Sequence, residues 1–155
     1  MSRPLDPDAL ATHLSEVYLA IGPLYRKVAR IVERDEPVMG MSTGVRAVLD
    51  QLRREGERTV PQMARTQDLS RQFVQRMVND AREAGFVELA INPTHRRSRL
   101  VRLTDTGRTA IEAVTRRELD LMRRVGGELT GAELTATLRV LHHMQQALDE
   151  IDRDA

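Results

Sequence analysis

Amide and guanidinium side chains recur at helical spacing in the middle of the chain. Arg71, Gln72, Gln75, Arg76 and Asn79 follow one another at steps of one and three residues, which places them on one face of a helix. Guanidinium groups can bind guanine or phosphate through paired N–H donors, and amides can bind adenine or phosphate. The spacing therefore suits recognition of a nucleic acid, and a solvated polar face is the alternative.

The charge distribution points the same way. Between residues 58 and 108, ten arginines accompany five acidic residues, whereas the rest of the chain has more acidic than basic side chains. A basic central module flanked by acidic ends favours contact with a polyanion in the middle of the chain.

The polar face lies on the second helix of a predicted helix-turn-helix. Thr59 and Gln62 form a TxxQ capping box that opens a short helix over about residues 60–66. Ser70 can cap the next helix, which runs over about residues 70–84 and is closed by Gly85. This second helix is the expected recognition helix, of a size that enters the major groove of duplex DNA.

A basic hairpin follows the recognition helix at once. After Gly85 the apolar residues alternate over 87–91 and again over 100–103, which predicts two strands. The loop between them reads NPTHRRS and carries Arg96 and Arg97 at its tip, where they suit the negative potential of a narrow minor groove. A helix-turn-helix followed by such a wing, over about residues 87–103, is a winged helix.

Both ends of the chain are predicted to be amphipathic helices. The N-terminal seam runs from Leu10 to Val32 in steps of three and four, and Thr130 with Glu133 forms a capping box before the last helix. Pairing with a second copy would bury both seams, and an intramolecular helix pair is the alternative. We therefore expect a mainly α, α+β winged-helix fold of about six helices with a two-stranded β-hairpin. The expected division is an N-terminal dimerisation helix over 1–37, the DNA-binding winged helix-turn-helix over 38–108 and C-terminal dimerisation helices over 109–155.

Several classes of protein are disfavoured. The chain has no cysteine, which excludes disulfides, thiolate metal sites and thiol switches. It has no GxSxG, HExxH, P-loop or GxGxxG motif, so we expect neither an enzyme nor a cofactor. Its aromatic content of 3% disfavours a binder of single strands or RNA, because such surfaces stack bases on aromatic rings. Without a long apolar run or a signal-peptide core, a cytoplasmic protein with no membrane contact is expected.

The run from Thr59 to Arg108 resembles the winged-helix core of the multiple-antibiotic-resistance regulator (MarR) family. The resemblance is carried by AREAGFVE after the recognition helix, NPxxRR in the wing and LTDTGR at the start of the next helix. It implies a bacterial homodimer with interlocked terminal helices that binds a pseudo-palindromic site in double-stranded DNA. It also implies a transcription regulator, more often a repressor, that a small aromatic or phenolic effector releases from DNA.

The resemblance carries over to individual residues. Arg97 matches the wing-tip arginine of the family, and the exposed positions of the recognition helix match its base-facing positions. The family usually has an aspartate two residues before that arginine, where this chain has His95. The expected DNA contacts are Ser70, Arg71, Gln72, Gln75, Arg76, Asn79, His95, Arg96 and Arg97.

Effector and metal sites are less defined. Tyr18, Tyr25 and Arg46 lie on helices expected to border the family's ligand cleft, where an arginine beside phenols could hold an aromatic carboxylate; ordinary surface roles are the alternative. Met39 and Met41 could add an apolar wall. We expect no metal site, and the alternatives left open are a metal-responsive regulator that uses His13, His142 and His143, and a winged helix that contacts only proteins.

The histidine in the wing generates a prediction. A protonated imidazole attracts phosphate, so we expect operator affinity to increase as the pH falls from about 7.5 to 6, through the range in which histidines usually titrate. The measurement is a DNA-binding curve at several pH values for the native protein and for His95→Asp. Identical pH dependence in the two proteins would contradict the hypothesis.

Overall fold

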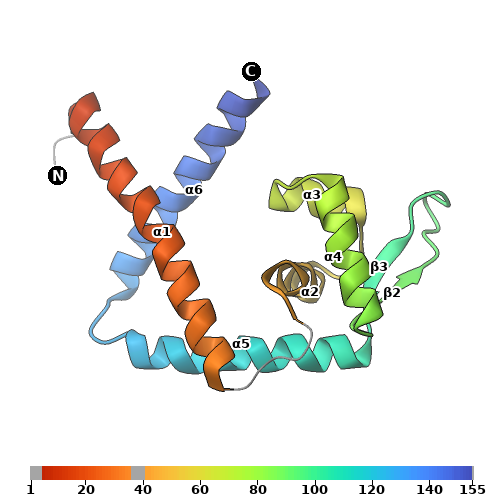
Figure 1. Ribbon diagram of the computed structural model, residues 1–155. Helices are drawn as coiled ribbons and strands as arrows, with labels where there is room; N and C mark the ends of the chain where they lie inside the picture. Colours follow the sequence, from red (N-terminus) through yellow and green to blue (C-terminus); the bar gives the residue numbers. More distant parts are fainter. Residues whose placement is uncertain (1–4, 36–40, 155) are drawn as a thin grey trace. The chain divides into compact units, whose positions relative to one another are not determined.

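The computed structural model describes residues 5–35 and 41–154, which form six helices and three short strands (Figure 1). The chain divides into two compact units, with the boundary between Leu119 and Asp120. The domain boundary expected between residues 37 and 38 lies outside the described residues, as does Met39.

The first unit holds the predicted helix-turn-helix and wing. Its helices begin where the sequence supplies caps: the Ser42 and Ser70 hydroxyls accept hydrogen bonds from Val45 N and Phe73 N. Both bonds of the Thr59–Gln62 capping box are present, as predicted. The elements are α1 (Pro7–Asp35), α2 (Thr43–Glu55), β1 (Arg58–Thr59), α3 (Val60–Gln67), α4 (Arg71–Glu83), β2 (Val87–Ala90), β3 (Leu100–Leu103) and α5 (Asp105–Val125).

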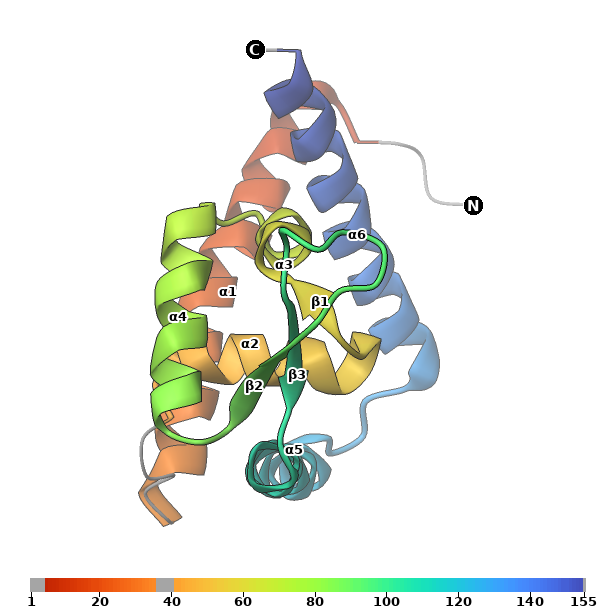
Figure 2. The same ribbon diagram turned by 90° about the vertical axis from the view of Figure 1, so that its right-hand side faces the viewer.

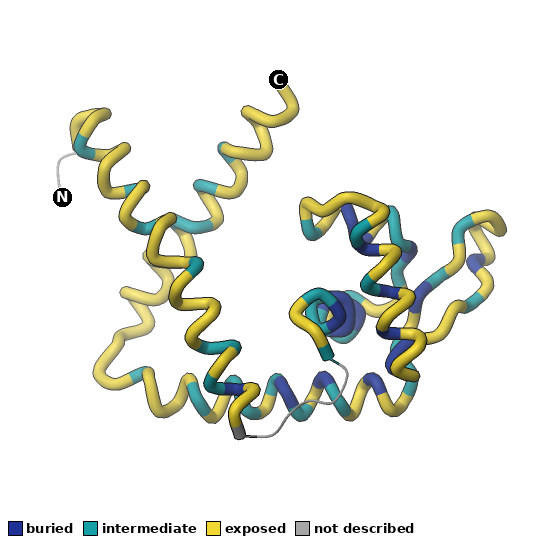
Figure 3. Tube along the Cα trace, viewed as in Figure 1, coloured by how far each residue is buried: buried dark blue, intermediate teal, exposed yellow. Residues whose placement is uncertain are grey.

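The core of this unit lies around α2. Leu49 of α2 and Met63 of α3 are both 0% exposed, and the inner face of α4 is buried with them. Figure 3 shows the buried positions gathered on α2, α4 and the neighbouring part of α5. Each fully buried aliphatic side chain contributes about 1.5–3 kcal/mol relative to an exposed one, so these contacts fix α4 on the scaffold. The buried apolar residues of the three helices and the sheet include Val45, Val48, Leu49, Met63, Val74, Val78, Ala81 and Val101.

The sheet has one strand more than the sequence predicted. It is antiparallel with the order β1-β3-β2, and Leu89 of β2 faces Val101 of β3 (Figure 2). The extra strand, β1, has only two residues, too few for an alternating pattern to be visible in the sequence. The first wing strand also ends one residue early: it stops at Ala90, and Ile91 is exposed outside it.

The terminal helices are present and leave their apolar seams exposed. On α1, Leu24 is 63% exposed. In the second unit, α6 (Gly131–Arg153) has no buried residue, and Leu138 is 54% exposed. The predicted capping box of α6 is formed, and hydrogen bonds from the Thr130 hydroxyl and backbone N–H hold the pKa of Glu133 below its usual value. None of the described helices combines the length and apolar character that a membrane crossing needs.

The start of α5 is anchored to the turn between α4 and β2. The Thr104 hydroxyl donates to Gly85 O at 2.6 Å and accepts from Gly107 N at 3.0 Å, so Thr104 caps the N-terminus of α5. Gly107 packs on the same turn, where a Cβ would lie 1.9 Å from Phe86 O. The glycine of the LTDTGR motif is therefore required by a close backbone approach.

This contact predicts that replacing Gly107 lowers the stability of the protein more than replacing a glycine with open space around it. Gly107→Ala forces Cβ into a backbone carbonyl and should lower the free energy of unfolding by about 1–3 kcal/mol. Gly131→Ala is the control, because a Cβ there meets no atom within 4 Å. Urea denaturation of both variants measures the difference, and equal stability of the two would show that the α5 anchor does not constrain residue 107.

Candidate nucleic-acid interface

The outer face of α4 presents the side chains that the sequence assigned to it. Arg71, Gln72, Gln75, Arg76 and Asn79 are all exposed, and the opposite side of the helix is buried against α2 and α3. Because the buried side fixes the rotation of α4, the polar side chains have a defined direction.

An open groove brings part of this face together with the wing. The groove has a volume of about 490 Å³ and lies between the N-terminal half of α4, the start of α3 and the wing. It unites Arg71, Gln72 and Gln75 with Arg97, while His95 and Arg96 lie exposed in the wing loop and do not line it. The lining residues are Val60, Pro61, Arg71, Gln72, Gln75, Leu89, Arg97, Ser98, Arg99 and Val101.

Sequence reasoning missed one cation of the groove. Arg99 is exposed and lines the groove beside Arg97. The two residues are separated by one position, and in an extended segment such residues share a face. The spacing of Arg97 and Arg99 was therefore the feature of the sequence that could have indicated Arg99.

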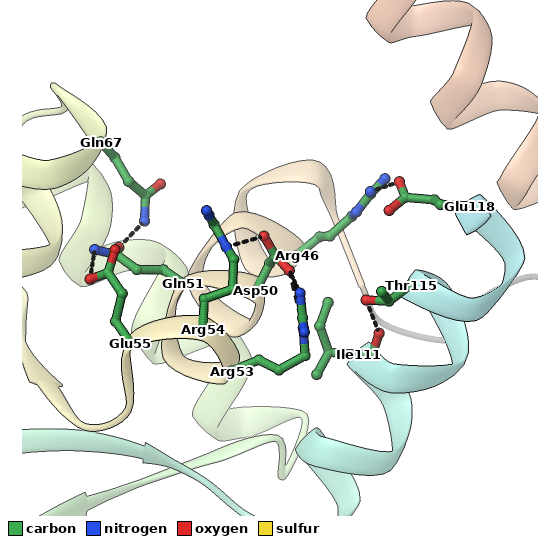
Figure 4. A network of polar contacts seen from close by, with 10 residues as sticks. All are labelled: Arg46, Asp50, Gln51, Arg53, Arg54, Glu55, Gln67, Ile111, Thr115 and Glu118. Atoms are coloured by element: carbon green, nitrogen blue, oxygen red, sulfur yellow. Dashed lines mark hydrogen bonds and ion pairs between the residues drawn. The ribbon is translucent and has the colours of Figure 1, made fainter. Parts of the chain in front are cut away.

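The arginines of this surface differ from the scaffold arginines in their partners. Asp50 binds both Arg53 and Arg54 at 2.9 Å, and Glu88 binds Arg102 at 2.6 Å (Figure 4 shows the Asp50 pairs). In the described ranges, by contrast, no carboxylate lies within 4 Å of the guanidinium groups at positions 71, 96, 97 and 99. The cations of the groove and the wing are therefore available to an anionic partner without first losing a carboxylate.

Two contacts restrain side chains on the face of α4. The Arg76 guanidinium lies 5.5 Å from the centroid of the Phe73 ring, a cation–π contact. Gln75 Nε2 donates a hydrogen bond to Asn79 Oδ1 at 3.0 Å, one helical turn further on. The middle of the face is therefore partly ordered before any partner binds.

The wing loop is organised by one buried side chain. Asn92 is 6% exposed, and its Oδ1 accepts from Thr94 N at 3.1 Å, from the Thr94 hydroxyl at 2.7 Å and from His95 N at 3.3 Å. This is the turn that the Asn-Pro pair predicted. The imidazole of His95 is exposed and has no hydrogen bond to any described residue, so it does not hold Arg97.

A polar network behind the interface ties α2 to its neighbours (Figure 4). Gln51 is 1% exposed, accepts from Gln67 at the end of α3 at 2.5 Å and donates to Glu55 at 3.1 Å. At the other end of α2, Arg46 forms an ion pair with Glu118 of α5. The network fixes both the helix-turn-helix and the approach of α5.

No contact among the described residues joins those that the sequence assigned to an effector site. Tyr18 and Tyr25 are 65% and 50% exposed on α1, and no described contact joins them to Arg46. Arg46 is already neutralised by Glu118, and Met41 is half-buried.

The histidines form no cluster with metal-binding character among the described residues. His13 Nδ1 lies 3.1 Å from Glu16 Oε2 on the exposed side of α1. In the described ranges no group of three or more His, Asp or Glu side chains could hold a metal ion.

Comparison with known proteins shows a likeness to one family. The sequence model of the MarR family matches residues 39–98. This segment of the chain is therefore similar to the MarR family. The uncharacterized protein Rv2011c of Mycobacterium tuberculosis is 42% identical over 90 residues, which are 58% of this chain and 63% of that protein. The match thus spans less than two thirds of the relative's length.

Solved structures extend the likeness over nearly the whole chain. The MarR family transcription regulator SP03579 is 27% identical, with a TM-score of 0.72 over 95% of this chain and 99% of that one. The MarR of Staphylococcus aureus, solved in complex with salicylate and kanamycin, has a TM-score of 0.72 at 14% identity and covers 88% of this chain and 92% of its own. The second likeness shows the fold alone. MarR-family proteins are transcription regulators and not enzymes.

The wing loop supports a prediction about Asn92. Asn92→Ala removes the acceptor of three hydrogen bonds, so the backbone of residues 93–98 should become mobile, with NMR order parameters falling from about 0.85 to below about 0.6. Asn92→Asp keeps an acceptor oxygen at the same place and should keep the loop ordered. The idea fails if the alanine variant retains the native order parameters.

Proposed function

We propose that this chain is a homodimeric transcription regulator that binds a specific pseudo-palindromic site in duplex DNA. The observation that carries the proposal is the groove in which unpaired wing arginines meet the polar face of α4. Cationic groups without partners gain most from phosphate, and amides on the same surface can distinguish bases.

The dimensions of α4 suit the major groove. The helix has 13 residues, a length of about 20 Å, and the major groove, about 12 Å wide, admits one helix. Arg71 at its N-terminus and Arg97 across the groove would bind the phosphate backbone on either side of the bases that α4 reads. Arg96, at the exposed tip of the wing, would reach the neighbouring minor groove.

The exposed seams of the terminal helices support a dimer. Leu148 and Ile151 of α6 are 61% and 66% exposed, and Leu24 of α1 is 63% exposed. An exposed apolar seam along a helix is rarely left in water, and a second copy is the simplest cover for each of the two seams. A two-fold dimer presents two lobes to two half-sites about one helical turn apart, which matches a pseudo-palindrome. Bound across a promoter, it would act as a repressor in the cytoplasm of a bacterium.

A small aromatic acid is the proposed effector. Salicylate, found in the complex with the Staphylococcus aureus MarR, has this chemistry. In this chain Arg46 is the cation that could take such a carboxylate, with Tyr18 and Tyr25 of α1 as candidate phenolic neighbours. Arg46 joins α2 to Glu118 of α5. A ligand carboxylate that replaced Glu118 would release this contact and allow α2, with the helix-turn-helix packed on it, to shift along α5.

The DNA-binding proposal is tested by a matched pair of double variants. Arg96→Ala with Arg97→Ala removes two unpaired wing cations per chain and should weaken duplex binding and lower the salt slope by about 2–4 for a dimer. Arg53→Ala with Arg54→Ala removes the same charge from α2, where Asp50 already pairs with both residues, and should leave the slope unchanged. The measurement is the duplex dissociation constant between about 50 and 200 mM salt.

Sedimentation of the complex completes the test and should count two chains for each duplex. An equal salt slope in the wing variant and the native protein would show that the wing does not touch DNA. A native protein with no preference for any duplex over random competitor would overturn the proposed function as a whole.

A further inference from the structure

The amides of Gln75 and Asn79 form a unit on the exposed face of α4. Gln75 Nε2 donates to Asn79 Oδ1 at 3.0 Å, and both residues are exposed. Gln75 also lines the groove with Arg71 and Arg97, whereas Asn79 does not. Gln75 is thus the member of the pair that faces a partner bound in the groove, and Asn79 supports it from behind.

The hydrogen bond fixes which atoms Gln75 can offer. It uses one of the two N–H groups of the Gln75 amide and leaves the other N–H together with Oε1, for which the described residues provide no partner. A carboxamide has one acceptor oxygen and one NH₂ group, so the remaining edge presents one acceptor beside one donor.

We infer that Gln75 reads an adenine in the major groove and that Asn79 is the positioning residue that holds its amide for this contact. The inference rests on the proposed binding of duplex DNA. Adenine presents the N6 amino donor beside the N7 acceptor, which complements one acceptor and one donor. Guanine presents two acceptors, O6 and N7, and would place O6 against the Gln75 carbonyl.

Asn79 matters because a free glutamine amide can rotate and exchange its oxygen and nitrogen. Without the bond to Asn79, both orientations of the Gln75 amide are accessible. The conformational entropy of the amide is then lost on DNA binding, which weakens the complex. With the bond, the reading edge is set beforehand. The flanking arginines do not replace this function, since phosphate contacts carry no sequence information.

The first step of the experiment is to select bound duplexes from a random library with the full-length native protein. The consensus should contain an A·T pair at which replacement by G·C weakens binding about tenfold or more. Gln75→Glu should move the preference at this position to cytosine, whose N4 amino group a carboxylate accepts. An unchanged preference in Gln75→Glu would overturn the assignment of Gln75.

Three further variants test Asn79 on the same pair of duplexes. Asn79→Ala should reduce the A·T over G·C ratio to below about threefold, while thermal unfolding shows that the exposed site tolerates alanine. Asn79→Asp keeps the acceptor for Gln75 Nε2, so the ratio should be retained although the added negative charge weakens binding to both duplexes. Glu83→Gln, which changes an exposed side chain of α4 outside the pair, the groove lining and the expected DNA contacts, should also leave the ratio unchanged.

The outcomes separate this inference from the proposed function. Loss of the ratio in Asn79→Ala with retention in Asn79→Asp supports a positioning role. A ratio that survives in Asn79→Ala, or that is lost equally in both Asn79 variants, overturns it while the protein remains a sequence-specific DNA binder. If the library yields no enriched duplex, the proposed function itself fails.

Discussion

The packing of α4 on α2 is the constraint on which the rest of the first unit depends. Val74, Val78 and Ala81 are at most 1% exposed and fill the space beside Val48 and Leu49. A helix with one side held this tightly cannot rotate about its axis without opening cavities, which cost several kcal/mol in such cores. The opposite face is consequently presented in one direction, and its polar side chains act as a fixed array.

Charge pairing distinguishes the arginines of α2 and the sheet from those of the groove and the wing. On α2 and on the outer face of the sheet, carboxylates such as Asp50 and Glu88 neutralise their arginine neighbours. In the groove and the wing, arginines have no described carboxylate partner. The net charge of +1 conceals this local difference, because it sums basic and acidic side chains over the whole chain. The same division explains why arginine content alone is a poor guide to function, since a paired guanidinium must first lose its partner to bind phosphate.

Local features of the fold followed from the sequence, and long-range ones did not. Caps at Ser42, Ser70 and Thr130 depend on residues three positions apart, so both partners can be read together. The strand β1, by contrast, exists because Thr59 meets Leu100, a pairing that no local period reveals. The candidate site divides in the same way: the face of α4 was predictable from helical spacing, whereas the bond between Gln75 and Asn79 required atomic positions. Arg46 shows the limit most clearly, because its partner Glu118 is distant in the sequence and decides whether the cation is free.

The helix α5 links the site to the remainder of the chain. Its first turn is tied to the α4–β2 turn by Thr104 and by the close packing of Gly107 on Phe86, and further along Glu118 binds Arg46 of α2. The helix then continues without a break across the boundary between the two units. The contacts of Thr104 and Gly107 form one anchor of α5, and the Arg46–Glu118 ion pair forms the other. Because an α-helix is stiff over this length, a displacement of α5 must either move the turn before β2 with it or break the ion pair. The Arg46–Glu118 contact is the more easily exchanged of the two anchors, since an ion pair can accept another partner, whereas the packing of Gly107 on Phe86 is a close backbone contact. In the proposed function, release of DNA by an aromatic acid begins at this ion pair and reaches the wing through the fixed start of α5.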